Sequence, residues 1–329
     1  MTLHIEQAGP LVSLQDAGRP GGLGSGLSRG GAADRHGYLD ACALAGAPFG
    51  AAAIEMAGFG GRFRFTDRCR FALAGARMRA TLDGAPLLWN ASHWAEPGAV
   101  LSIGGAEDGV YGYLLPGHGV DADLELGGRG YHRIAGLGRA LAAGDRLAIF
   151  PAADTAPVFL PDQSPATGPL RVMPGPQTEL FDETTRARFE ATPFTRSTRA
   201  NRQGVRLDQT GAAFASGGQL SRVSDFIAEG DIQMTGDGTP YVLLADCQTM
   251  GGYPRIGTVI PADVPRLAQA LPGDEIRFAF LSVEEAEALW QPDEAYLRAA
   301  AARCKPRLRD PREIDDLLSY ELIGKPLDD

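Results

Sequence analysis

The sequence predicts a mainly β protein with a barrel-like architecture and few helices. Short apolar runs recur along the chain, and Gly, Pro, Asp or Asn residues separate them, which is the pattern of strands joined by tight turns. Because 43 glycines and 23 prolines interrupt runs this short, a mainly β barrel is favoured over an alternating β/α fold. The runs that we interpret as strands are 62–65, 70–74, 100–103, 146–150, 242–244 and 276–280.

Two internal segments carry helical signals. Residues 35–45 lie between Asp34, which can cap a helix, and Gly46, which can end one. Asp263 is a second potential cap, and the apolar residues of 264–271 recur at helical spacing, which predicts a helix with one face in the core.

The chain is predicted to contain two similar β domains. A Gly-Asp turn followed by an apolar strand occurs once in each half, and a connector rich in Pro, Asp and Ser separates the halves. We therefore predict domains at 1–160 and 168–292, followed by a tail at 293–329. Ser282 and Glu285 form a capping box near the end of the second domain, and the Ala- and Arg-rich start of the tail favours a helix.

Composition argues against several functional classes. The formal charge is −10 and lysine is confined to Lys305 and Lys325, which disfavours a nucleic-acid surface. No run reaches the roughly 18 apolar residues of a membrane span, and the start lacks signal-peptide regions, so we expect a cytoplasmic protein without a membrane partner. Neither the four cysteines nor the five histidines show ligand spacing, so no metal site is predicted.

A first candidate site lies in the stretch QDAGRPG, residues 15–21. A planar guanidinium flanked by Gly and Pro suits bidentate recognition of a carboxylate, so we predict that Arg19 and the neighbouring Gln15 bind substrate. Asp16 is a catalytic candidate. The alternative is that Asp16 accepts backbone N–H groups in a turn and that Arg19 neutralises it.

A second polar stretch, DCQTMGGYP, follows a predicted strand that ends at Ala245. Asp246 is a catalytic candidate because strand ends hold side chains in fixed but accessible positions, although a turn capped by Asp246 is the alternative. Neutral amides and hydroxyls suit urea-like or lactam groups, and the predicted substrate-binding residues are Gln248, Thr249, Gly251, Gly252 and Tyr253. Cys247 has no histidine nearby in sequence and is not expected to act as a nucleophile.

Three isolated residues complete the candidates. Glu55 lies in an apolar stretch, where burial would favour a catalytic general base, or where it would be the buried partner of an arginine. Arg206 is a candidate substrate contact or a surface charge on a strand. Gln233 precedes a predicted hairpin turn and is a further substrate-binding candidate, and the sequence leaves open which face of the strand it occupies.

Taken in order, these stretches resemble the large subunit of the biotin-dependent carboxyltransferase family. This family includes the urea carboxylase carboxyltransferase domain, the allophanate hydrolase subunit 2 (urea amidolyase-related) proteins and the C subunit of bacterial 5-oxoprolinase. The resemblance implies two cyclophilin-like β-barrel domains with a site between them, so we expect both polar stretches to face one cleft. Cys247 departs from the family pattern, which has Arg there, as do 127–131 and 201–204. The matching segments are 9–21, 28–34, 54–55, 170–177, 204–207, 232–240 and 272–274.

The resemblance implies a component of an enzyme complex. The first hypothesis is the C subunit of an ATP-dependent 5-oxoprolinase, which hydrolyses 5-oxo-L-proline to L-glutamate. ATP would be handled by the complex, with a smaller companion subunit of the B type and a lactam-utilisation subunit of the A type as partners. The alternative is a carboxyltransferase component that moves a carboxyl group to urea or a related amide from biotin carried on a separate protein. A non-catalytic regulatory protein-binding module, and a homo-oligomer, remain open.

Overall fold

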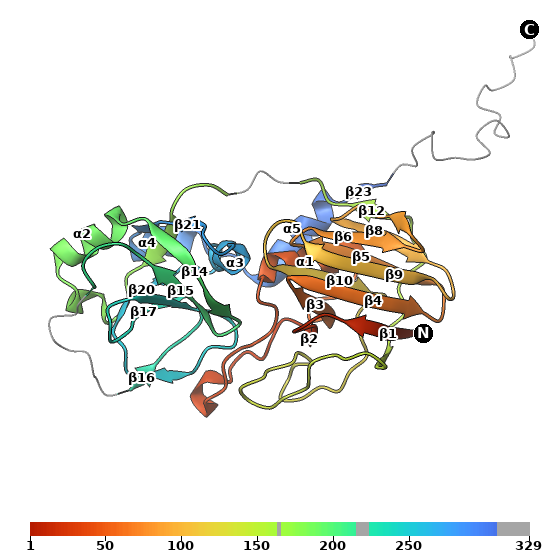
Figure 1. The fold of residues 1–329 in the computed structure, drawn as a ribbon, viewed down its shortest axis with the longest axis horizontal. Helices are drawn as coiled ribbons and strands as arrows, with labels where there is room; N and C mark the ends of the chain where they lie inside the picture. The colour runs from red at the N-terminus through yellow and green to blue at the C-terminus, as the bar shows by residue number, and fades with distance from the viewer. Residues whose placement is uncertain (163–165, 215–223, 308–329) are drawn as a thin grey trace, which may run out of the picture.

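The computed structural model describes residues 1–162, 166–214 and 224–307, and confirms a mainly β fold (Figure 1). Strands from residues 2–159, joined by the short strand β23 at Lys305–Pro306, form two sheets, and strands from residues 170–280 form a third. The part of the predicted tail at 308–329 lies outside the described residues. Within the described ranges, none of the helices is long and apolar enough to span a membrane.

The first half is a sandwich of two antiparallel sheets around an apolar core. One sheet has the order β11-β1-β4-β9-β6-β7 and the other β2-β3-β10-β5-β8-β12-β23. Side chains such as Phe63, Phe71 and Leu114 fill the space between the sheets and are fully buried. The strands are β1 (Thr2–Ala8), β2 (Ser13–Gln15), β3 (Ala53–Ala57), β4 (Phe59–Phe65), β5 (Cys69–Gly75), β6 (Met78–Leu82), β7 (Ala85–Pro86), β8 (Ala91–Ala95), β9 (Val100–Ala106), β10 (Tyr111–Pro116), β11 (Arg146–Ala148) and β12 (Val158–Phe159).

The second half is a nearly closed barrel. Its eight-stranded sheet has the order β21-β14-β15-β18-β17-β20-β13-β22. The two edge strands β21 and β22 are separated in sequence by Arg277 alone, so the sheet must curl until its edges approach each other. Phe189 and Phe278 stack inside it at 4.8 Å between ring centroids. The strands are β13 (Leu170–Met173), β14 (Phe194–Asn201), β15 (Gly204–Asp208), β17 (Asp231–Met234), β18 (Pro240–Leu243), β20 (Arg255–Val259), β21 (Glu275–Ile276) and β22 (Phe278–Phe280), beside a small ribbon of β16 (Asp225–Phe226) and β19 (Met250–Gly251).

Most of the expected helices are present. The α1 helix (Arg35–Ala45) is capped by the Asp34 side chain, which accepts the N–H of Gly37, and ends at Gly46 in the left-handed conformation. The capping box of Ser282 and Glu285 starts α4 (Val283–Ala288), and α5 spans Asp293–Arg303. Single 3₁₀ turns lie at Leu23–Ser25 (η1) and Thr178–Leu180 (η2).

Three details differ from the expectations. The sequence did not indicate α2 (Glu183–Ala191), in which Phe189 is the one buried residue. Asp263 occupies the cap position of α3 (Val264–Gln269), but its side chain makes no capping hydrogen bond and instead binds Arg171 through two guanidinium nitrogens. The predicted strand 276–280 is interrupted at residue 277, because its two parts form opposite edges of the barrel.

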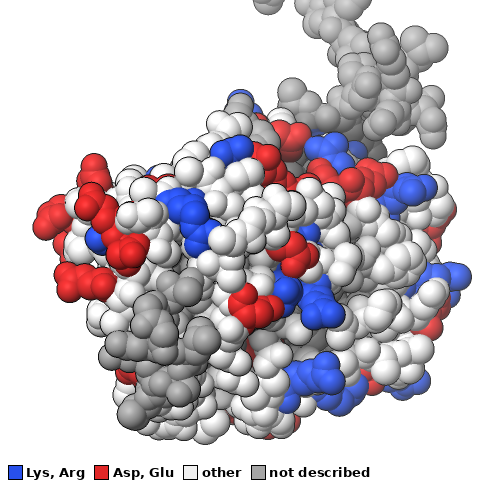
Figure 2. Space-filling view, turned by 60° about the vertical axis from the view of Figure 1, so that its left-hand side comes forward, with Lys and Arg blue, Asp and Glu red and all other residues white. Residues whose placement is uncertain are grey.

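Side chains from the second half join the two halves firmly. The Gln269 amide of α3 accepts the N–H groups of Val110 and Tyr111, and donates to the Asp34 carboxylate and to the Tyr111 carbonyl. After the barrel, α5 returns to the first half and lies beside α1 (Figure 1). There the Tyr296 ring stacks on the His36 ring of α1 at 4.3 Å between centroids. Acidic and basic side chains lie next to each other near the middle of the face in Figure 2.

Candidate functional site

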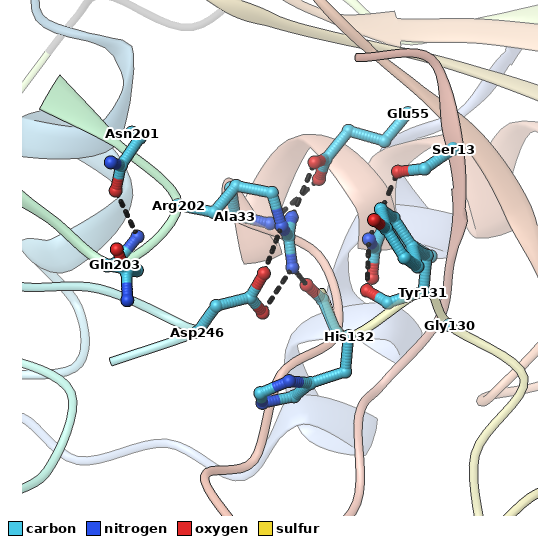
Figure 3. A network of polar contacts seen from close by, with 12 residues as sticks. Ser13, Ala33, Glu55, Gly130, Tyr131, His132, Asn201, Arg202, Gln203 and Asp246 are labelled. Atoms are coloured by element: carbon cyan, nitrogen blue, oxygen red, sulfur yellow. Dashed lines mark hydrogen bonds and ion pairs between the residues drawn. The ribbon is translucent and has the colours of Figure 1, made fainter. Parts of the chain in front are cut away.

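A buried ionic network occupies the seam between the two halves (Figure 3). Arg202 lies in the turn between β14 and β15, and a hydrogen bond from the Gln203 N–H to the Asn201 carboxamide shapes this turn. The Arg202 guanidinium donates to both carboxylate oxygens of Asp246, at 2.8 and 2.9 Å. It also donates to Glu55 of β3 and to the Gly31 carbonyl. Arg202 of the barrel therefore contacts both β3 and the segment around Gly31 in the first half.

The second oxygen of Glu55 is fully occupied as well. It accepts the Tyr113 hydroxyl and the Ala33 N–H, each at 2.8 Å, and the Tyr113 hydroxyl in turn accepts the Asp34 N–H. Tyr113 and Glu55 are direct neighbours across β10 and β3. The structure thus gives Glu55 an arginine partner, which is one of the two roles that the sequence left open. Its function as a general base stays a prediction.

Charge balance explains why this network is stable. Burial alone would lower the pKa of Arg202, but the charges of Glu55 and Asp246 raise it well above the ordinary value. Glu55 and Asp246 are almost completely buried, at 1% and 4% side-chain exposure. Buried charges are tolerated only when they are paired and hydrogen-bonded. The network therefore fixes the relative position of the two halves.

In the first polar stretch, the side chains of Asp16 and Arg19 form hydrogen bonds with backbone groups. The Asp16 carboxylate accepts the N–H groups of Gly18 and Arg129, at 2.8 and 2.6 Å. The Arg19 guanidinium, 2% exposed, donates to the carbonyls of Glu125, Gly128 and Gly130. Arg19 therefore fastens the 125–130 loop and does not neutralise Asp16 through a hydrogen bond.

Two polar atoms of this stretch remain without a protein partner among the described residues. They are the buried Nη1 of Arg19 and the buried Oε1 of Gln15. The other end of the Gln15 amide donates to the Tyr131 carbonyl at 2.9 Å and to the Ser13 hydroxyl. Nη1 is thus the Arg19 nitrogen left to donate a hydrogen bond to a substrate. Binding of a substrate carboxylate by Arg19 stays a prediction.

A cavity of about 750 Å³ lies against this stretch, at the junction of the two halves. Asp16 and Gly18 form part of its wall, and three arginines, Arg29, Arg35 and Arg129, also line it. Arg29 and Arg35 face the carboxylates of Glu229 and Asp293 at 3.2–3.8 Å. Asp293 and Glu294 line the cavity as well, so it combines three carboxylates with three guanidinium groups, a composition suited to a polar or charged ligand.

The second polar stretch divides between the seam and a separate cavity. Asp246 joins the seam network, whereas Gln248 and Tyr253, together with Gln233, line a cavity of about 240 Å³ in the barrel half. Gly251 adjoins the Gln233 amide, and Gly252 follows it in the same loop. The sequence could not assign Gln233 to a face of its strand. The structure buries it toward Gln248.

Two further candidates lie apart from these cavities. Thr249 is 9% exposed, and its hydroxyl oxygen faces Gly26 of the first half. Arg206 on β15 is paired with Asp208 and Asp237 at 3.0 and 3.5 Å, on the outside of the barrel. The structure therefore places Arg206 in the role of a strand charge. A direct contact with substrate stays a prediction for both residues.

Segments next to the two polar stretches meet, but the side chains of the stretches line different cavities. The Gly30 N–H donates to the Ala245 carbonyl at 3.0 Å, which ties the first half to the segment leading to Asp246. Asp16 nevertheless lines the 750 Å³ cavity, while Gln248 lines the 240 Å³ cavity. The two stretches therefore contribute to two separate cavities and do not face one common cleft.

Comparison with known proteins assigns the fold. Residues 25–280 match the family model described as carboxyltransferase domain, subdomain A and B. The chain belongs to the carboxyltransferase family. The solved urea carboxylase of Kluyveromyces lactis has a TM-score of 0.81 at 23% identity, covering 94% of this chain and 31% of that one, which supports the fold alone.

Within the carboxyltransferase family, the chain is similar to components of enzyme complexes. It is 33% identical over 315 residues to the C subunit of 5-oxoprolinase from Escherichia coli (strain K12), covering 92% of this chain and 98% of that protein. The Haemophilus influenzae protein of the same name is 30% identical over 296 residues, covering 87% of this chain and 93% of that protein. A putative urea carboxylase from Emericella nidulans is also 30% identical, over 86% of this chain and 24% of that protein.

The seam contains residues of the carboxyltransferase chain that sequence reasoning had not assigned to a site. Besides Arg202 and Tyr113, these are Ser28 and His132, whose side chains are buried and lie 2.8 Å apart. The Nδ1 atom of His132 accepts the Ala135 N–H, so Nε2 carries the proton and donates it to the Ser28 hydroxyl. Ser28 belongs to the segment 28–34, which matches the family, and Arg202 to 201–204, which departs from it; these segments were the available signal.

Cys247 does not have the properties of a nucleophile. Its side chain is 3% exposed and packs with Ile227 and Leu243. Burial, followed by the nearby charges of Glu229 and Asp231, raises the pKa of the thiol to about 12. A thiolate is the reactive form of cysteine, so this side chain serves as a small apolar group.

Proposed function

We propose that this chain is the C subunit of an ATP-dependent 5-oxoprolinase, acting in the cytoplasm with a companion subunit of the B type and a lactam-utilisation subunit of the A type. The observation that carries the proposal is the match to the C subunits of two 5-oxoprolinases over almost the whole of both chains. The match to urea carboxylase uses only a quarter of that larger protein.

The proposed reaction opens a lactam ring at the expense of ATP. ATP phosphorylates the lactam oxygen and leaves as ADP. One water adds to the activated carbon, the C–N bond breaks with a proton passing to nitrogen, and the product is an acyl phosphate. A second water releases phosphate and leaves L-glutamate. The complex as a whole handles ATP under this proposal.

The 750 Å³ cavity is the proposed place for the anionic substrate. Asp16 is the catalytic candidate whose side chain lines a cavity, whereas Glu55 and Asp246 are engaged by Arg202. Two backbone N–H groups, from Gly18 and Arg129, hold the Asp16 carboxylate in a fixed orientation at the wall of the cavity. Arg29, Arg35 and Arg129 supply positive charge for a substrate carboxylate.

A carboxyltransferase activity is the second candidate, supported by the family model and by the urea carboxylase relatives. In this reaction a carboxyl group moves from the biotin of a separate protein to a nitrogen of urea or a related amide. The urea nitrogen gains the carboxyl carbon and loses a proton, and the biotin nitrogen regains one. Such an activity would need biotin, and it would not consume the water that releases phosphate in lactam hydrolysis.

Reconstitution separates these activities. The chain would be purified alone and with its A-type and B-type partners, and glutamate and ADP would be measured with 5-oxo-L-proline and ATP. We expect turnover only in the complex, with Asp16→Asn reducing kcat at least ten-fold and Asp154→Asn, at an exposed position, leaving it unchanged. Turnover by the isolated chain, or carboxylation of urea without lactam hydrolysis, would contradict the proposal. An inert complex would favour a regulatory module.

A further inference from the structure

The three arginines of the 750 Å³ cavity differ in how their charges are used. Arg29 and Arg35 each face the carboxylates of Glu229 and Asp293, at 3.2–3.8 Å. These two carboxylates offset the two guanidinium charges and join the first half to the barrel and to the start of α5. The Arg129 guanidinium forms no ion pair with any residue that the structure describes. Its charge is therefore available to a ligand.

The Arg129 side chain is held near its middle and is open at its tip. Its Nε donates to the Ala122 carbonyl at 3.0 Å, which sets the direction of the guanidinium. The two terminal nitrogens make no hydrogen bond within the described ranges, and neither is closed off from solvent. The residue is partly exposed and lines the cavity. Two such N–H donors match the two oxygens of a carboxylate.

The backbone around Arg129 is anchored by the first polar stretch. Arg19 donates to the carbonyls of Gly128 and Gly130 at 3.2 and 2.8 Å, and the Asp16 carboxylate accepts the Arg129 N–H at 2.6 Å. A Cβ atom added at Gly128 would lie 2.9 Å from Cγ of Arg19, so the loop packs directly on that side chain. A ligand that binds Arg129 therefore does not have to order the loop, which favours affinity.

From these observations we propose that Arg129 makes the 750 Å³ cavity specific for a ligand that carries a carboxylate. Its two terminal nitrogens donate to the two carboxylate oxygens, while Arg29 and Arg35 stay engaged with Glu229 and Asp293. The identification of this ligand with 5-oxo-L-proline rests on the proposed function. The selection of a carboxylate by Arg129 does not.

The test compares two probes of similar shape, cyclopentanecarboxylate and the uncharged cyclopentanecarboxamide. Binding to the full chain would be followed by NMR through the Arg129 Nε–H signal, assigned by its loss in Arg129→Met. For so small a ligand we expect a Kd of roughly 1 mM for the carboxylate and about ten-fold weaker binding of the carboxamide. Arg129→Met should bind both probes equally weakly. Arg129→Lys should keep part of the preference, because the charge remains and the planar fork is lost.

Arg133→Met is the matched control. Arg133 is an exposed arginine four residues further along the same loop and does not line the cavity, so its variant should keep the full preference for the carboxylate. Should Arg129→Met fail to fold, Arg129→Lys still carries the comparison. An unshifted Arg129 signal at about ten times the expected Kd would overturn the proposal. So would a carboxylate preference that survives in Arg129→Met, or one that is lost equally in Arg133→Met.

Kinetics of the complex separate this inference from the proposed function. With 5-oxo-L-proline and ATP, Arg129→Met should raise KM about ten-fold and change kcat little, since the lost contact binds a part of the substrate that does not react. An active complex in which Arg129→Met leaves KM unchanged would overturn the role of Arg129. A complex without turnover would refute the proposed function, and the probe preference of the chain would still decide the role of Arg129.

Discussion

The ionic seam and the Gln233 cavity treat buried polar groups in opposite ways. At the seam, both oxygens of Glu55 and of Asp246 are bound by protein donors. In the cavity, the buried nitrogen of Gln233 has no partner among the described residues. Because burial without a partner is costly, a fully paired network stabilises the fold, whereas an unpaired buried group contributes less to stability. The two regions should therefore respond differently to mutation.

The largest effect is expected at Arg202. Arg202→Met leaves two buried carboxylates without a counter-charge, so we expect the free energy of unfolding to fall by about 3–5 kcal/mol, as measured by chemical denaturation. Arg206→Met is a matched control on β15, where the partners are exposed carboxylates, and should cost less than about 1 kcal/mol. Equal losses in the two variants would show that the seam is not structural.

Arg19 tests whether a side chain with one nitrogen unpaired among the described residues serves both the fold and a ligand. Arg19→Lys loses part of a three-carbonyl contact to the 125–130 loop, so we expect a loss of roughly 1.5–3 kcal/mol in unfolding free energy with the fold retained. If Nη1 also binds the substrate carboxylate, KM for 5-oxo-L-proline should rise in the complex. Unchanged stability, turnover and KM would remove Arg19 from both roles.

How much of this structure the sequence predicts depends on how far apart in the chain the interacting residues lie. The α1 helix was predictable because Asp34 and Gly46 mark its ends locally, whereas α2 was missed because Phe189 is its single buried residue and leaves no apolar stripe. At the site, the polar stretches were visible as local composition. The pairing of Arg202 with Glu55, 147 residues away in sequence, was not visible, because it depends on how the two halves of the chain pack together.

The Asp40 carboxylate on α1 is intermediate between the fully paired carboxylates of the seam and the unpaired nitrogen of Gln233. Its carboxylate is partly paired, with Arg303 at 3.6 Å and the Tyr296 hydroxyl at 3.4 Å, both from α5. Burial, and then the charge of Asp34, raises the pKa of Asp40 to about 7. The folded state therefore holds the proton more tightly than the unfolded state does, so stability falls as pH rises from about 4 to about 7.

Asp40→Asn should reduce this pH dependence. Since the side chain is 22% exposed and solvent screens its charge, we expect a gain of only about 1–2 kcal/mol in unfolding free energy at pH 8, and little change near pH 4. Thermal unfolding across this range is the measurement. A residual slope of the same sign is expected from Asp34, whose pKa burial raises to about 6. An unaltered pH profile would exclude Asp40 as its source.

The smallest effect on stability is expected at Gly251. A Cβ atom added there would lie 2.7 Å from the Gln233 side-chain nitrogen, which must then turn away, and this is the flexible end of a side chain. Gly251→Ala should thus cost less than about 1 kcal/mol in unfolding free energy, measured by chemical denaturation, because the unpaired amide can turn without losing a hydrogen bond to the described residues. Gly236→Ala, with no neighbouring atom within 4 Å of the added Cβ, is the control. A loss at Gly251 as large as that of Arg202→Met would show that the unpaired Gln233 amide is held as rigidly as the paired groups of the seam, and the contrast between the two regions would then fail.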